Sequence, residues 1–144
     1  MTSDGPLRFK PDAGALRSIR RGSREMAERL GAPEAMCDIV ALVVDELVNN
    51  AIEHGASYRR LGADLSVGVA MDRGRVCVEF IDPEMPDQHV QGLAAALAAA
   101  GNGMPSLESE RGRGLFLIAI YMEEVRVAIA PGGGLQLIGR LAPG

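Results

Sequence analysis

A long apolar run at helical spacing constrains the fold of this chain more than any other feature. The run follows Pro33, at a position that tolerates the missing N–H of proline, and continues to about His54, where Gly55 supplies a stop. A helix of this length with one broad apolar stripe must pack that stripe against another layer of structure. The stripe is formed by Met36, Ile39, Val40, Val43, Val44, Leu47, Val48 and Ala51.

Two pairs of alternating segments predict the second layer. Residues 64–71 and 75–82 alternate apolar and polar side chains, and the glycine-containing turn between them indicates a hairpin. Residues 125–130 and 135–141 form a similar pair around Pro131 and three glycines. The chain therefore carries at least two hairpins after its long helix.

The beginning of the chain adds one strand and one helix. Leu7 to Lys10 fits a short strand, Asp12 is a candidate N-cap, and Gly31 ends the helix that follows. The whole order predicts an α+β fold in one domain over residues 1–144. We expect a two-layer α/β sandwich, with helices on one face of a mixed, mainly antiparallel sheet.

Residues 83–111 lack a strand pattern and contain three prolines. A segment of this length is typical of a functional lid, and its alanine-rich part, Leu93–Ala100, predicts a short helix. Gly112, Arg113 and Gly114 follow, and then the apolar stretch Leu115–Met122 predicts a buried helix.

Composition excludes several classes of protein. The formal net charge of −4 argues against a nucleic-acid binder, and no apolar run is long enough for a membrane helix. The polar N-terminus lacks the apolar stretch of a secretory signal. Cys37 and Cys77 predict two reduced, buried thiols, so we expect a cytoplasmic protein. Four arginines between Arg17 and Arg24 indicate a solvated helix face or a docking surface for an acidic protein.

The end of the long helix carries a polar pair. Glu46 and Asn50 are four residues apart, so they lie on one face, with Asn50 at the edge of the apolar stripe. A carboxylate and an amide placed like this can act as a general base and as an oxygen ligand for magnesium. The alternative is an ordinary polar helix end, with His54 placed favourably for the helix dipole.

Two further features point to the same kind of site. Asp82 ends an apolar strand, where its carboxylate can accept a hydrogen bond from a ligand amine or simply start a turn before proline. Gly112 and Gly114 precede a helix, so their free N–H groups can meet phosphates or form a plain junction.

These motifs resemble those of the Bergerat-fold ATPases, the group that contains gyrase, histidine kinases and heat-shock chaperones. Residues 46–51 with His54 and Gly55 resemble the N box, Asp82 corresponds to the aspartate of the G1 box, and residues 112–115 resemble the G2 box. The resemblance extends from about Leu7 to Leu141. The short chain is most similar to the anti-sigma-factor serine kinases of bacterial partner-switching systems.

The resemblance implies ATP and magnesium as ligands, and a role for each motif residue. Glu46 would be the catalytic base acting on a partner's Ser or Thr hydroxyl, and Asn50 would hold the magnesium ion. Asp82 would bind the adenine amino group, and Gly112, Arg113 and Gly114 would cradle the phosphates. The implied partners are a sigma factor or equivalent regulator and a small anti-anti-sigma (STAS-type) protein. A homodimer is also expected.

The G1 box departs from the family pattern. Glu84 and Pro86 occupy positions where the family has glycine, and the last hairpin, with Gly134, Leu135, Gln136 and Leu137, lacks the threonine expected to support the adenine contact. A second hypothesis is therefore a module that sequesters its partner without phosphorylating it. A third, the catalytic part of a sensor histidine kinase, is less favoured because the only histidines are His54 and His89.

Overall fold

The protein folds into two layers, one of helices and one of strands. The fold comes from a computed structural model that describes residues 2–3, 5–101 and 117–142. In chain order the labelled elements are β1 (Thr2–Ser3), β2 (Leu7–Phe9), the 3-10 turn η1 (Ala13–Ala15), α1 (Leu16–Arg29), α2 (Glu34–Gly55), β3 (Leu65–Asp72), β4 (Arg75–Asp82), α3 (Asp87–Gly101), β5 (Met122–Ile129) and β6 (Leu135–Leu141). Residues 117–121 are also helical.

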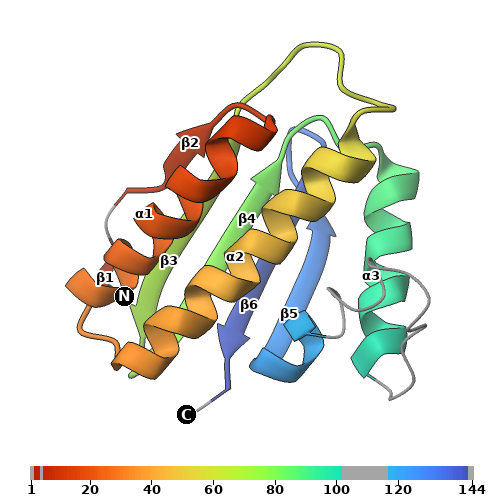
Figure 1. The fold of residues 1–144 in the computed structure, drawn as a ribbon. Helices are drawn as coiled ribbons and strands as arrows, with labels where there is room; N and C mark the ends of the chain where they lie inside the picture. The colour runs from red at the N-terminus through yellow and green to blue at the C-terminus, as the bar shows by residue number, and fades with distance from the viewer. Residues whose placement is uncertain (1, 4, 102–116, 143–144) are drawn as a thin grey trace.

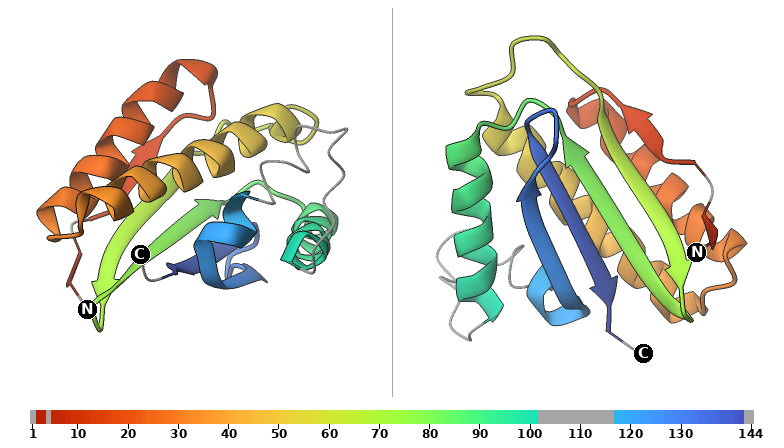
Figure 2. Two further views of the ribbon diagram at one scale, coloured as in Figure 1. Left: turned by 60° about the horizontal axis from the view of Figure 1, so that its bottom comes forward. Right: turned by 180° about the vertical axis from the view of Figure 1, so that it is seen from behind.

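The strands form one six-stranded sheet, in the order β1-β3-β4-β6-β5, with β2 also paired to β3. Every strand pair in the described part of the chain is antiparallel, so the parallel pairing implied by a mixed sheet is not found there. Helices α1 and α2 lie across one face of the sheet, and α3 stands beside β5 at its edge (Figures 1 and 2). The predicted α+β sandwich is confirmed.

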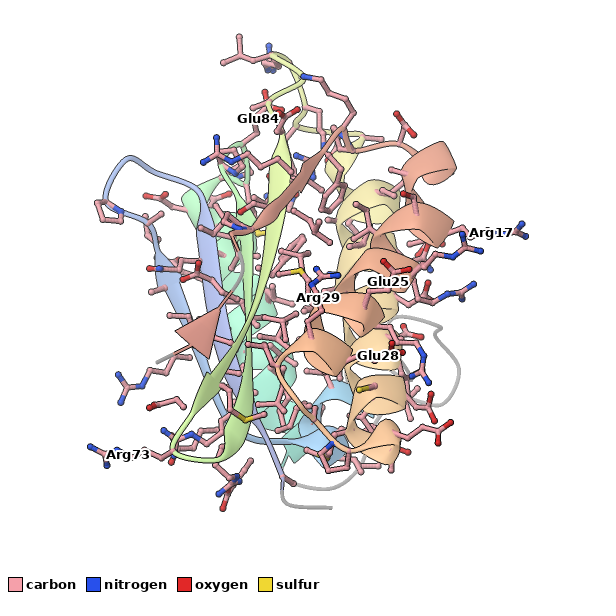
Figure 3. All side chains as sticks on the ribbon, turned by 90° about the vertical axis from the view of Figure 1, so that its left-hand side faces the viewer. Arg17, Glu25, Glu28, Arg29, Arg73 and Glu84 are labelled. Carbon is pink, nitrogen blue, oxygen red and sulfur yellow. The ribbon has the colours of Figure 1, made fainter. Side chains whose placement is uncertain are left out.

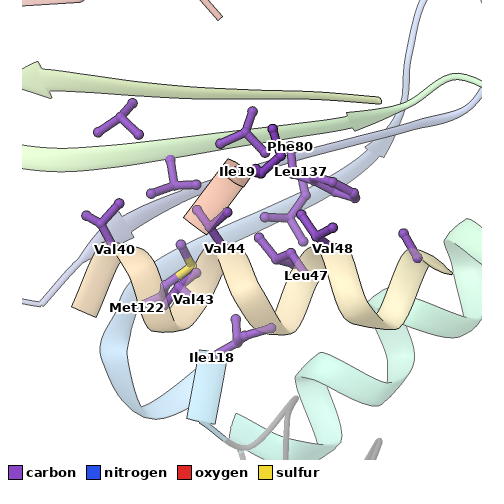
Figure 4. Packing of buried hydrophobic residues seen from close by; sticks show 14 of the residues in the cluster. Ile19, Val40, Val43, Val44, Leu47, Val48, Phe80, Ile118, Met122 and Leu137 are labelled. Carbon is purple, nitrogen blue, oxygen red and sulfur yellow. The ribbon is translucent and has the colours of Figure 1, made fainter. Parts of the chain in front are cut away.

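The core lies between α2 and the inward face of the sheet (Figure 4). In β4, alternate residues point toward the helices, beginning with Val76 and Val78 and continuing with Phe80. Phe80 pairs across the sheet with Val67 of β3 and Leu137 of β6, and all three side chains are buried. Because side chains alternate along a strand, the next inward position of β4 belongs to Asp82.

The local signals of the sequence explain most element boundaries. Asp12 caps η1 by accepting a hydrogen bond from the N–H of Ala15 at 3.1 Å. Gly31 ends α1 with φ of 85°, and the β3–β4 hairpin turns through Arg73 and Gly74 at φ of 52° and 77°. Pro33 is the N-cap of α2, which ends at Gly55 as predicted.

Helix α3 differs from the prediction, because it starts at Asp87 rather than near Leu93. Its first turn follows Pro86, whose carbonyl accepts the N–H groups of His89 and Val90. Val90 is buried, so the apolar face of this helix begins before the alanine-rich segment that suggested it. Strand β5 likewise starts at Met122, inside the stretch expected to be helical. The rest of the expected lid, residues 102–111, lies outside the described residues.

Both cysteines are free thiols. Cys37 is buried, as predicted, and burial raises the pKa of its thiol. Cys77 is only partly buried, because it lies on the face of β4 opposite the helices. Within the described ranges, no helix is long and apolar enough to cross a membrane.

Candidate functional site

Several segments meet at one end of the molecule. Figure 1 shows the C-terminal end of α2, the end of β4, the start of α3 and the β5–β6 turn at this end. Residues 56–64, which connect α2 to β3, pass over it. The site is built around Asp82, the last residue of β4.

Asp82 is the only charged residue that is fully buried in the described part of the chain, with 0% of its surface exposed. Its burial follows from the alternation of β4, which turns it toward the helices in line with Phe80. A buried carboxylate needs hydrogen-bond donors, because the uncompensated charge would be costly. The structure supplies these donors from within the chain.

Four donors saturate the Asp82 carboxylate. The Arg59 guanidinium binds both oxygens, with Nη1 at 2.7 Å from Oδ1 and Nη2 at 2.6 Å from Oδ2. The Tyr58 hydroxyl donates to Oδ2 at 2.9 Å, and the Glu84 N–H donates to Oδ1 at 3.2 Å. A carboxylate offers about four lone-pair sites. In this arrangement none is left for a ligand amine.

Arg59 is seated closely against α2. Its Nη2 also donates to the carbonyl of Ala51 at 3.2 Å, and a Cβ atom on Gly55 would lie only 2.7 Å from the guanidinium. The glycine therefore leaves the space that the guanidinium fills. Burial opposes the charged form of Arg59, but hydrogen bonds and the negative charge of Asp82 outweigh it, so the Arg59 pKa is raised.

Tyr58 contacts the site with both its hydroxyl and its ring. Burial, followed by the charge and hydrogen bond of Asp82, raises the pKa of the Tyr58 phenol well above its usual range. The ring meets the ring of His89 edge-on, with centroids 5.0 Å apart. The phenol therefore stays protonated and acts as a donor to Asp82.

Glu84 fastens the 56–64 loop over the site. Its carboxylate accepts the N–H groups of Leu61 at 2.6 Å and of Arg60 and Ala63 at 3.3 Å. Its Oε2 lies 3.9 Å from Nη1 of Arg59. The hydrogen bond from Leu61, with those from Arg60 and Ala63, lowers the pKa of Glu84. Figure 3 shows Glu84 at this end of the molecule.

The β5–β6 turn closes the site from the other side. Gly134 has φ of 89°, and a Cβ atom there would lie 2.5 Å from the Asp82 carbonyl oxygen and 2.6 Å from Cα of Pro83. Only glycine combines this backbone conformation with such close approach. This turn therefore holds the end of β4 at a fixed position.

The predicted polar pair lies on α2. Asn50 is partly buried, and its Oδ1 atom is buried without a hydrogen-bond partner among the described residues. Glu46 is one turn earlier and also partly buried, whereas Asn49 is exposed. Asp45 does not point freely into solvent, because it lies 3.5 Å from Arg20 of α1. An orphaned amide oxygen fits the oxygen preference of magnesium.

The structure thus brings Asp82 to the end of the helix that carries Glu46 and Asn50. Gly112, Arg113 and Gly114 lie outside the described residues, so their predicted role stays a prediction. The sequence interpretation missed Tyr58 and Arg59. The alternation of β4 does signal that Asp82 is buried and needs a cation, but it does not identify which arginine supplies it.

The arginines of α1 are partly explained by acidic neighbours. Arg24 lies 2.6 Å from Asp38 of α2 and 3.4 Å from Glu28, and Arg20 pairs with Asp45. Arg17 points away from the body of the protein (Figure 3). Exposed pairs of this kind contribute about 0–1 kcal/mol each. They support a solvated, ion-paired surface between α1 and α2.

Comparisons with known proteins agree with this fold. Ten chains of solved structures are similar to it. One of them belongs to the crystal structure of the SiaB–SiaC complex from Pseudomonas aeruginosa. The match has a TM-score of 0.75 and 17% sequence identity, and covers 96% of this chain and 89% of that chain. No functionally curated protein matches the sequence.

A family profile identifies the chain more directly. The profile of the histidine kinase-like ATPase domain matches residues 9–138, which extend from the last residue of β2 through α1, α2, the candidate site and α3 into the first half of β6. The match therefore covers most of the 144 residues. The chain belongs to the histidine kinase-like ATPase domain family, whose description as an ATPase implies ATP binding.

Proposed function

We propose that the chain is an ATP-dependent protein serine/threonine kinase of the partner-switching type. Its substrate would be a Ser or Thr of a small anti-anti-sigma (STAS-type) protein, and in another state it would sequester a sigma factor or equivalent regulator. The observation that best supports a kinase is the buried Oδ1 of Asn50, one helical turn after Glu46, which has no hydrogen-bond partner in the part of the chain that the structure describes. Membership in an ATPase family supports the nucleotide.

Each residue has a chemical task in this proposal. Asn50 would hold magnesium, which when bound would neutralise charge on the phosphates. Glu46 would accept the proton of the partner's hydroxyl as that oxygen forms a bond to the terminal phosphorus, and the bond from this phosphorus to ADP would break so that ADP leaves. The backbone of Gly112, Arg113 and Gly114 would hold the phosphate oxygens at a helix N-terminus. Positioning and charge stabilisation would provide most of the catalysis.

The partner is proposed from the likeness to a chain of a two-protein complex. A fold that covers nearly the same length in both chains supports a protein partner here as well. We also propose a cytoplasmic setting and a homodimer, because dimers are common in the resembling kinases. Light scattering after size exclusion tests the dimer and should give twice the mass of one chain.

Phosphate transfer tests the kinase directly. The full chain is mixed with radiolabelled ATP, magnesium and the cognate anti-anti-sigma protein. Label should appear on the partner, and Glu46→Ala or Asn50→Ala should reduce the rate by about 100-fold or more. Asn49→Ala is the matched control on the exposed side of the same helix and should leave the rate unchanged. Unlabelled partner, or full activity of Glu46→Ala, would contradict the assignment.

A second candidate function is a module that sequesters its partner without catalysis. The saturated carboxylate of Asp82 favours it, because the residue expected to bind adenine already has four donors. Calorimetry separates the two functions. Tight partner binding without any ATP binding supports the module, whereas ATP binding with phosphate transfer supports the kinase.

A further inference from the structure

The base end of the proposed nucleotide site contains an intramolecular ligand. An adenine amino group would approach Asp82 as a hydrogen-bond donor, and Arg59 already donates to both oxygens of that carboxylate. Arg59 and adenine therefore compete for one acceptor. A bidentate, charge-assisted pair is a stronger partner than a single neutral amine.

The loop that carries Arg59 is held in place at several points. Glu84 accepts three backbone N–H groups of residues 60–63, and the Arg59 guanidinium also reaches the Ala51 carbonyl of α2. Tyr58 occupies the remaining side of the Asp82 carboxylate. Arg59 is thus not a surface arginine that meets Asp82 by chance, since its side chain is only 11% exposed.

We propose that Arg59 is a built-in competitor of adenine, and that ATP binds only when the guanidinium leaves Asp82. The inference rests on the nucleotide site of the proposed function and names how that site is regulated. If the site is open for a fraction f of the time, the apparent Kd for ATP is the Kd of the open site divided by f. A site that is open about 1% of the time therefore binds ATP about 100-fold more weakly than a site that is always open.

Competition by Arg59 and simple electrostatics predict opposite changes in ATP affinity when Arg59 is removed. If Arg59 were an ordinary basic residue of the site, removing its positive charge should weaken the binding of the negatively charged nucleotide. Removing a competitor should strengthen it. Arg60 is the matched control, because it is the next residue of the same loop, it is exposed, and its side chain makes no hydrogen bond or ion pair within the described residues.

Calorimetric titration of the full chain with Mg·ATP tests the inference. Arg59→Ala should bind ATP about tenfold or more tightly than the unaltered chain, whereas Arg60→Ala should bind equally or more weakly. Arg59→Lys should fold normally, because it keeps a cation beside Asp82. It should also bind ATP more tightly than the unaltered chain, but by less than Arg59→Ala, because lysine lacks the planar guanidinium that binds both carboxylate oxygens. If Arg59→Ala is unfolded, the lysine variant decides the question.

A comparison of two nucleotides shows whether the increase in affinity of Arg59→Ala arises at the contact between Asp82 and the base. Inosine triphosphate presents a carbonyl where ATP has the amino group, so this position of the base accepts a hydrogen bond and cannot donate one to Asp82. The gain in Arg59→Ala should appear for ATP and be absent for inosine triphosphate. An equal gain for both nucleotides, a loss of ATP affinity in both arginine variants, or no binding to any variant would overturn the inference.

These outcomes are separate from those of the kinase assay. A gain in ATP affinity without any phosphate on the partner would support competition by Arg59 and contradict the kinase. If the unaltered chain transfers phosphate but Arg59→Ala binds ATP no more tightly, the kinase is supported and competition by Arg59 is contradicted.

Discussion

At the scale of single residues, Asp82 decides how the site behaves. Its side chain is buried because β4 alternates, and it is satisfied because Arg59, Tyr58 and the Glu84 N–H supply four donors. A fully satisfied buried network is rigid, while a network missing one member is costly. The same carboxylate therefore serves stability in one state and is expected to serve ligand binding in another.

Removing Arg59 should destabilise the protein. Arg59→Ala leaves the buried Asp82 charge without its cation, so we expect the free energy of unfolding to fall by about 3 kcal/mol. Adding Asp82→Asn to that variant should restore part of the loss, because an amide is less costly to bury. Urea denaturation measures both variants. Arg60→Ala should stay within about 0.5 kcal/mol, and an equal effect of the two arginines would contradict the buried pair.

Tyr58 gives a pH-dependent signal of the same network. Its phenol pKa is raised above the ordinary value of 10.0, so the hydrogen bond to Asp82 stabilises the fold fully below pH 10. The contribution is lost as the pH rises through the raised pKa. In a Tyr121→Phe variant, Tyr58 is the only tyrosine, and its phenolate absorbance should appear well above pH 10. A midpoint near 10 in the folded protein would contradict the buried hydrogen bond.

At the scale of elements, local patterns determined what could be predicted. The spacing from Met36 to Ala51 predicted α2, and alternation predicted β3 and β4, because these signals lie within single segments. The start of α3 was missed because burial of Val90 depends on packing against the rest of the protein. The Arg59–Asp82 contact joins residues 23 apart in sequence, and no local period encodes it. The glycines at 112 and 114 stay a prediction.

The β5–β6 turn should depend on one of its glycines far more than on another. Gly134→Ala adds a Cβ atom 2.5 Å from the Asp82 carbonyl oxygen at positive φ, where the neighbouring backbone cannot move away. We expect the free energy of unfolding to fall by about 2 kcal/mol or more. Gly132→Ala is the matched control, since a Cβ atom there meets no heavy atom within 4 Å. Similar melting temperatures for the two variants would show that the turn is not held against β4.

At the scale of the whole molecule, two layers bring distant segments of sequence to one end. The sheet carries Asp82 to the end of the molecule where α2 stops, and the loop after α2 returns across it. The helix that carries Glu46 and Asn50 therefore also contacts Arg59, the residue that binds Asp82. The contacts are made by the Ala51 carbonyl and by Gly55 in the last turns of the helix. Helix α2 therefore contributes to both ends of the proposed site: Asn50 at the metal end, and the contacts to Arg59 at the adenine end.

In our proposal, α2 and Asp82 form one nucleotide site, and Arg59 keeps it closed by binding the Asp82 carboxylate. A crystal structure of the full chain with magnesium and a non-hydrolysable ATP analogue tests it most directly. We predict that the Asn50 Oδ1 atom is a ligand of the metal, that Asp82 faces the adenine amino group, and that Arg59 has moved off the carboxylate. An analogue bound elsewhere, with Arg59 still paired to Asp82, would show that these residues do not form a nucleotide site closed by Arg59.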